Sequence, residues 1–120
     1  MPLNKRDEVL LQKIVNYCDD IDKTNALFST SESALRENSV YRNALAMCLL
    51  QIGELTTHIS DEFKDTHQEI PWKDIRGMRN VAAHHYGNFS AKYLWQTINE
   101  DITELRRFCE SQLSKNDKPL

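Results

Sequence analysis

Apolar residues recur along this chain at spacings of three and four, which is the period of an amphipathic helix. The first stripe predicts a core helix from about Lys5 to Asp19. Its inward positions are Leu10, Ile14, Cys18 and Ile21. The segment from Asp22 to Asn38 is mostly polar and predicts short helical turns, one of them starting behind Ser31 or Ser33.

The longest predicted helix runs from Ser39 to about Lys64 and carries an unusually wide apolar stripe. The stripe consists of Tyr41, Leu45, Cys48, Ile52, Leu55 and Ile59, widened by Ala44, Met47 and Leu50. A helix that is apolar over much of its circumference must be covered on two sides, so one cover could be the core and the other a second subunit. Gly53 in mid-helix costs about 1 kcal/mol relative to alanine, which indicates close approach of another helix.

A loop from Asp65 to Ile70 leads to a helix bounded by Pro71 and Gly87, residues that suit the start and the end of a helix. A final long helix follows a cap within residues 88–90 and ends in a polar tail from Ser114 to Leu120. Its inward positions are Leu94, Ile98, Ile102, Leu105, Cys109 and Leu113. With only three glycines and three prolines, the chain lacks the turn residues of an all-β protein. We therefore expect one all-α domain over residues 1–120, an antiparallel up-and-down bundle of four main helices plus short ones.

The composition limits partners and compartment. A net charge of −3 argues against neutralising nucleic-acid phosphates over the whole surface, so any RNA contact must be local. The three cysteines are widely separated and form no Cys-x-x-Cys pair, which favours free thiols in a reducing cytoplasm. The N-terminus lacks the apolar region of a signal peptide, and no apolar run approaches the roughly 20 residues that span a bilayer. The expected location is cytoplasmic.

Polar side chains concentrate on the helix between Pro71 and Gly87. Arg76, Asn80 and His84 are spaced four apart and share one face. Arg79 and His84 lie five apart, so they are neighbours only if the arginine leans or the helix loosens near its end. The residues alone favour a structural interpretation, in which both arginines are solvated, His84 caps the last carbonyls and Tyr86 packs at the helix end.

Several chemistries lack the residues they need. His84 and His85 are adjacent on a helix and point about 100° apart, which does not suit joint binding of one metal ion. No glycine-rich loop cradles a phosphate, and no cysteine has an organised histidine partner, so we expect no cofactor and no thiol nucleophile. Acid–base and electrostatic chemistry remains. An arginine can clamp a phosphate, and a histidine can transfer a proton near pH 7.

The run from Trp72 to Tyr86, with Gly-Met-Arg-Asn at 77–80 and His-His-Tyr at 84–86, resembles the signature of the HEPN superfamily and its HepT-like toxin family. The family motif is an arginine, four to six residues, a histidine, and a tyrosine two residues later. Leu50-Gln51-Ile52-Gly53-Glu54-Leu55 is similar to the Ile-Gly-Glu motif of the family on an earlier helix, although the family more often has alanine where this chain has Leu55.

The resemblance implies a HEPN-like bundle and a metal-independent endoribonuclease toxin, whose cleft forms between two protomers of a homodimer. It implies Arg79 and His84 as catalytic residues, with Asn80, Glu54 and Arg76 in support. Glu54 is otherwise an exposed helical glutamate. The implied partner is a minimal nucleotidyltransferase (MNT) antitoxin that transfers AMP to Tyr86. The alternative is a non-catalytic helical subunit that only docks a nucleotidyltransferase.

Overall fold

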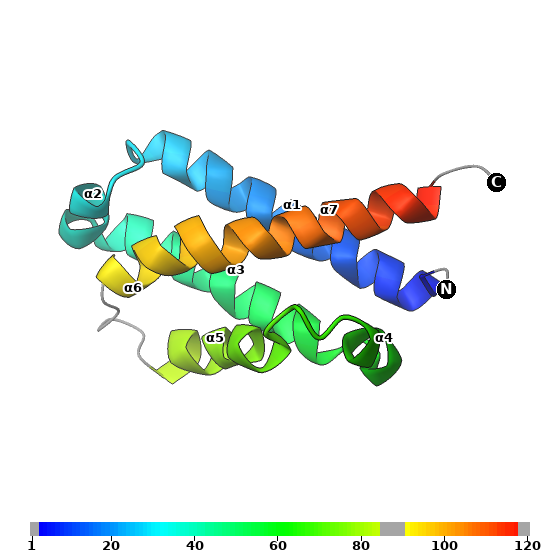
Figure 1. Ribbon diagram of the computed structural model, residues 1–120. Coiled ribbons are helices and arrows are strands. Elements are labelled where there is room, and N and C mark those ends of the chain that lie inside the picture. Colours follow the sequence, from blue (N-terminus) through cyan, green and yellow to red (C-terminus); the bar gives the residue numbers. More distant parts are fainter. Residues whose placement is uncertain (1–2, 85–90, 118–120) are drawn as a thin grey trace.

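The computed structural model confirms an all-α architecture (Figure 1). It describes residues 3–84 and 91–117, and of residues 80–84 and 116–117 it describes the backbone only. The main helices are α1 (Lys5–Leu27), α3 (Ser39–Thr57), α5 (Trp72–His84) and α7 (Thr103–Asp117). They alternate in direction along the chain, so that α1 begins and α7 ends at the same end of the molecule. The shorter elements are α2 (Glu32–Glu37), α4 (Asp61–Thr66), α6 (Ala91–Gln96) and the π-helical segment η1 (Thr97–Ile102).

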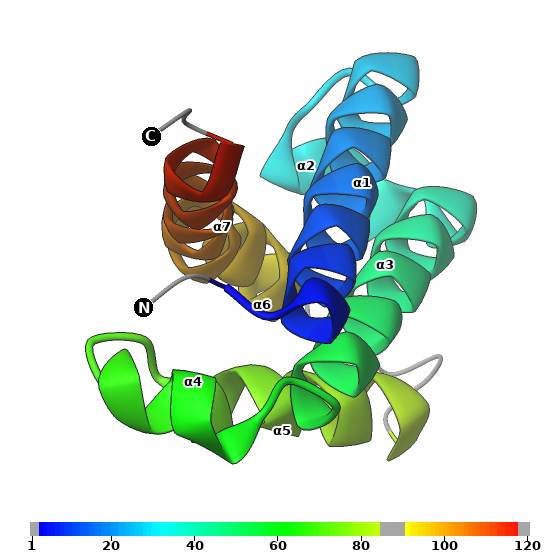
Figure 2. The same ribbon diagram turned by 90° about the vertical axis from the view of Figure 1, so that its right-hand side faces the viewer.

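Helix α3 lies at the centre of the bundle and packs against both α1 and α5, while α7 packs on the other side of α1. Figure 2 shows α4 and α5 together along the lower edge, beneath α1 and α3. The core consists mainly of buried leucine and isoleucine side chains and also contains Tyr41 and the three cysteines. Because α1 and α5 already cover two sides of α3, much of its wide apolar stripe is buried within the chain. Met47 of the stripe and the neighbouring Val40 of α3 remain exposed.

Helix α1 is longer than its pattern predicts: it continues to Leu27 rather than ending near Asp19. The physical reason lies on α7, where Arg106 pairs with Asp19 and, at 2.5 Å, with Asp22. These contacts hold the polar end of α1 against the bundle. The predicted turn behind Ser31 is confirmed, because the Ser31 side chain accepts a hydrogen bond from the Ala34 N–H and starts α2.

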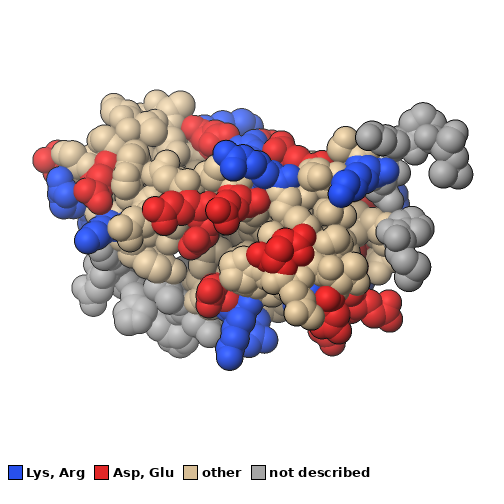
Figure 3. Space-filling model, viewed as in Figure 1, with Lys and Arg blue, Asp and Glu red and all other residues tan. Residues whose placement is uncertain are grey.

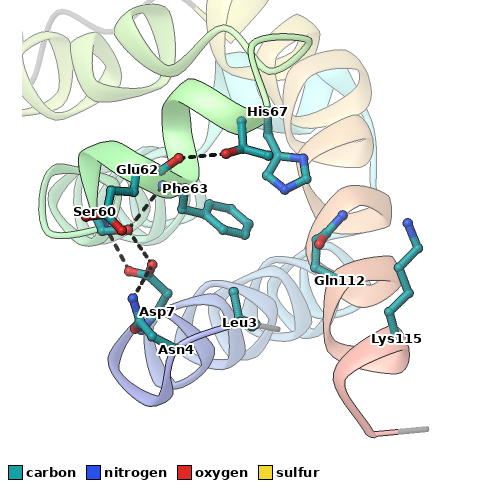
Figure 4. Close-up of a pocket in the computed structure, with 10 residues that line it drawn as sticks. Leu3, Asn4, Asp7, Ser60, Glu62, Phe63, His67, Gln112 and Lys115 are labelled. Carbon is teal, nitrogen blue, oxygen red and sulfur yellow. Dashed lines mark hydrogen bonds between the residues drawn. The ribbon is translucent and has the colours of Figure 1, made fainter. Parts of the chain in front are cut away.

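The prediction of one helix from Ser39 to about Lys64 was wrong. Helix α3 ends at Thr57, and Ser60 caps a separate helix α4 that includes the first residues of the predicted loop. Ser60 is held from the opposite end of the sequence, because the buried Asp7 carboxylate accepts from the Ser60 N–H at 2.9 Å and from its hydroxyl at 2.6 Å. Figure 4 shows this contact at the edge of a cavity of about 410 Å³ between α1, α4 and α7.

The end of the chain also differs from its prediction. The last helix begins as α6, passes through the π-helical segment η1 and continues as α7 to Asp117, so the polar tail predicted from Ser114 is still helical there. The inward positions Leu94, Ile98, Ile102, Leu105 and Cys109 are buried as expected, whereas Leu113 is only partly buried. In the described part of the chain, no helix is both long and apolar enough to cross a membrane.

Candidate functional site

Helix α5 carries the arginine of the motif at a half-exposed position. The helix begins at Trp72, and the Pro71 carbonyl accepts from the Ile75 N–H at 3.1 Å. Ile75 and Met78 are buried and fix the inner face. Arg79 follows Met78 at the edge of that face, with 38% of its side chain exposed. The arginine is therefore anchored on a packed helix and still reaches solvent.

Helices α3 and α5 touch at the backbone of Arg79. A Cβ atom added at Gly53 would lie 2.8 Å from the Arg79 backbone nitrogen and 3.0 Å from the Arg79 Cβ. The prediction that Gly53 marks the close approach of another helix is thereby confirmed. The contact places the residue after Gly53 within reach of the arginine side chain.

That residue is Glu54, and its carboxylate binds the Arg79 guanidinium. Glu54 Oε2 lies 2.9 Å from Arg79 Nη1, and the other oxygen, Oε1, lies 3.4 Å from His58 Nε2 one turn later on α3. The hydrogen bond from Arg79, followed by the one from His58, lowers the pKa of the Glu54 carboxyl below its usual value. Glu54 is therefore ionised near neutral pH and holds the arginine head in place.

The structure thus brings together Arg79 and Glu54, two of the site residues that the sequence suggested. They lie 25 residues apart in the sequence, on different helices. Arg76 is exposed on α5, and its side chain forms no hydrogen bond or ion pair with the described residues. Asn80 and His84 belong to the last turns of α5, but their side chains lie outside what the structure describes. Tyr86 lies outside the described residues altogether.

Sequence reasoning did not single out His58. The signal available was its spacing, because residues four apart on a helix are neighbours and Glu54 precedes His58 by four. That spacing is common among exposed charged residues. Only the contact between Glu54 and Arg79 makes the histidine part of this site.

The cysteines lie in the core and are unsuited to nucleophilic chemistry. Cys18, Cys48 and Cys109 are all buried and unbridged. Burial raises the pKa of the Cys18 thiol to about 12 and that of Cys48 to about 11, and it raises the pKa of Cys109 as well. The reactive form is the thiolate, which is scarce at neutral pH when the pKa is this high.

One face of the molecule is unfavourable for RNA. Figure 3 shows acidic side chains across the middle of the face on which α7 lies. In η1, burial and then the neighbouring carboxylates of Glu100, Glu104 and Asp74 raise the pKa of Asp101. Carboxylates that crowd one another in this way repel a phosphate backbone as well. RNA binding would have to use another part of the surface.

Comparison with known proteins agrees with the motif. The family model "Ribonuclease HepT-like" matches residues 14–112. A protein of Caldanaerobacter subterraneus subsp. tengcongensis, named as a candidate RNase, is 33% identical over 79 residues, which are 66% of this chain and 70% of that protein. A candidate RNase of Methanocaldococcus jannaschii is 27% identical over 109 residues, covering 90% of this chain and 98% of that protein.

A third relative, "Probable ribonuclease HepT" of Thermococcus cleftensis, is 38% identical over 63 residues, covering 52% of this chain and 57% of that protein. No solved structure matches at a significant level. The family model spans most of the chain, including the helices that carry Glu54 and Arg79. The chain belongs to the HepT-like ribonuclease family of HEPN proteins.

Proposed function

We propose that this protein is a metal-independent endoribonuclease in which Arg79 clamps the RNA phosphate and His84 transfers the proton. The observation that carries the proposal is the placement of Arg79. The contact with Gly53 fixes its backbone, Glu54 holds its guanidinium, and 38% of its side chain remains exposed. Family membership supports ribonuclease chemistry at this motif.

RNA carries its own nucleophile, which explains how so few residues could suffice. The 2′-oxygen attacks the adjacent phosphorus and forms a new P–O bond, while the bond from phosphorus to the 5′-oxygen of the next nucleotide breaks. A general base takes the 2′-hydroxyl proton, and a general acid protonates the leaving 5′-oxygen. The Arg79 guanidinium would neutralise charge that develops on the phosphate, and His84 would serve as the acid or the base.

We further propose that the active form is a homodimer and that the protein is the toxin of a toxin–antitoxin pair. Two site helices facing across a two-fold axis would concentrate positive potential that a chain of net charge −3 otherwise lacks. The partner would be an MNT-type nucleotidyltransferase that transfers AMP to Tyr86. The added phosphate would repel an incoming RNA backbone.

The direct test is cleavage of RNA by purified protein in excess EDTA. We expect cleavage, with 2′,3′-cyclic phosphate or 3′-phosphate ends, because attack by the 2′-oxygen leaves the phosphate on the 3′ side. End-group analysis of the fragments checks the chemistry. Loss of activity in EDTA that a divalent ion restores would contradict metal independence. RNA that stays intact under all conditions would favour the docking-subunit alternative.

The role of Tyr86 is tested by intact mass. Wild-type protein incubated with an active nucleotidyltransferase partner and ATP is expected to gain adenylate units, whereas Tyr86→Phe should gain none, because it lacks only the accepting hydroxyl. Tyr86→Phe should still cleave RNA and should no longer be inhibited by the partner. A wild-type chain that gains no mass would remove AMP transfer from the proposal.

A further inference from the structure

The carboxylate of Glu54 lies close to two different side chains, one at each of its oxygens. Oε2 lies 2.9 Å from Arg79 Nη1 on α5, and Oε1 lies 3.4 Å from His58 Nε2 on α3. The described contacts therefore form a chain from His58 through Glu54 to Arg79. An isolated pair such as Glu54 and His58, four apart on an exposed helix surface, contributes little to stability. Any importance of His58 must lie in what it does to Arg79.

The contact with Gly53 fixes only the backbone and Cβ of Arg79, so the position of the guanidinium depends on the contacts of the side chain. The close contact involves the Arg79 backbone nitrogen, Cα and Cβ, and it leaves the long side chain to rotate. The guanidinium is held in one place by the Glu54 carboxylate, which is itself at the end of a flexible side chain with 43% exposed. A carboxylate held at only one oxygen could turn.

His58 is well placed to prevent that turn because its own backbone is fixed. It directly follows the last residue of α3 as the C-cap, and its N–H donates to the carbonyls of Leu55 and Thr56. The next residue, Ile59, is buried with 2% exposure. The residue after that, Ser60, is bound by the buried Asp7 carboxylate, as Figure 4 shows. The histidine is thus attached to a rigid junction between α3 and α4.

We propose that His58 is a positioning residue for Arg79 and acts through Glu54. While His58 occupies one carboxylate oxygen, Glu54 offers only the other to the guanidinium. Without His58, both oxygens can pair with Arg79 in the bidentate geometry that arginine and carboxylate favour. RNA phosphate must compete with that pair for the arginine. The inference rests on the proposed function, because it assumes that Arg79 binds the phosphate of RNA.

The test is a comparison of three variants in RNA cleavage. His58→Ala is expected to raise KM about 3- to 10-fold, at the lower end of the coupling found between neighbouring side chains, with kcat within about twofold. His58→Gln should restore the wild-type KM, since its amide N–H can still donate to Glu54. Arg36→Ala is the matched control, because it breaks the pair with Glu32 that has the same spacing and the same 3.4 Å distance. It should change neither constant.

A double mutant shows whether the effect passes through Glu54. In a Glu54→Gln background, adding His58→Ala should leave KM unchanged, since a neutral amide no longer competes for Arg79 as an anion. An unchanged KM in the single variant, or the same increase with and without Glu54, would overturn the proposal. Unfolding of His58→Ala in thermal melts, with His58→Gln also failing to restore KM, would assign His58 a structural role instead.

The ¹⁵N resonances of the Arg79 guanidinium separate this inference from the proposed function, because they report the ion pair without RNA. These resonances are expected to shift in His58→Ala and to stay in place in Arg36→Ala and His58→Gln. They are assigned by their disappearance in Arg79→Lys, which has no guanidinium. Shifted resonances in a protein that does not cleave RNA would uphold the contact chain and reject the ribonuclease role of Arg79. Unshifted resonances in an active enzyme would overturn the role of His58 alone.

Discussion

Replacing Arg79 or His84 by alanine is expected to lower RNA cleavage by a factor on the order of 10² or more, as the loss of charge stabilisation or of acid–base catalysis does. The fold should survive both changes. Arg79 is half exposed, and its partner Glu54 remains solvated when the arginine is removed. Initial rates of cleavage measure the effect, and helical circular dichroism and the melting temperature report the fold.

Two controls make this result specific. Arg107→Ala removes an exposed arginine from α7, and His85→Ala removes the histidine next to His84 in the sequence. Both should cleave RNA at rates close to wild type. If Arg79→Ala or His84→Ala instead unfolds the protein, or if Arg107→Ala loses as much activity, the motif residues have a structural or a diffuse electrostatic role.

The same pair of variants tests the shared cleft. Mixing an Arg79→Ala chain with a His84→Ala chain should restore part of the activity if each site draws residues from both protomers, because one site in a mixed dimer can then be intact. Light scattering should give the mass of a dimer. A fully active monomer would contradict the shared cleft while leaving the assignment of the two residues in place.

The second large effect is expected from Gly53→Ala. The new Cβ would lie 2.8 Å from the Arg79 backbone nitrogen, and backbone cannot swing aside as the end of a side chain can. The two helices must separate, which costs roughly 1–3 kcal/mol of stability. The higher helix propensity of alanine offsets about 1 kcal/mol of this cost. The shift also moves Arg79 relative to Glu54. A displacement approaching 1 Å can lower catalysis on the order of 10²-fold.

Gly77→Ala is the matched control, two residues before Arg79 on the same helix. Nothing lies within 4 Å of the position that its Cβ would take. It should raise stability by about 1 kcal/mol through helix propensity and leave cleavage unchanged. Urea denaturation and cleavage rates measure both variants. A Gly53→Ala protein as stable and as active as Gly77→Ala would mean that the helix contact does not determine the site.

Local sequence patterns were sufficient to predict the helices where each turn carried its own apolar position. The stripe on α3 and the positions from Leu94 to Cys109 were predicted as inward, and all but a few are buried. Two of the errors in helix boundaries fell at Asp19 and Ser60. There the partner that decides the helix boundary, Arg106 or Asp7, comes from a distant element and leaves no local signal.

The sequence by itself determined the all-α class, the start of a helix directly after Pro71, and a motif that resembles a ribonuclease family. The predicted helix end at Gly87 and the cap within residues 88–90 lie outside the described residues. Arg79 follows from that motif. Its contact with Glu54 and the inclusion of His58 were decided by the tertiary structure alone. Helical period and capping depend on residues within a turn or two of one another. The meeting of Gly53 with Arg79 depends instead on how α3 and α5 cross, which all their packed side chains set together.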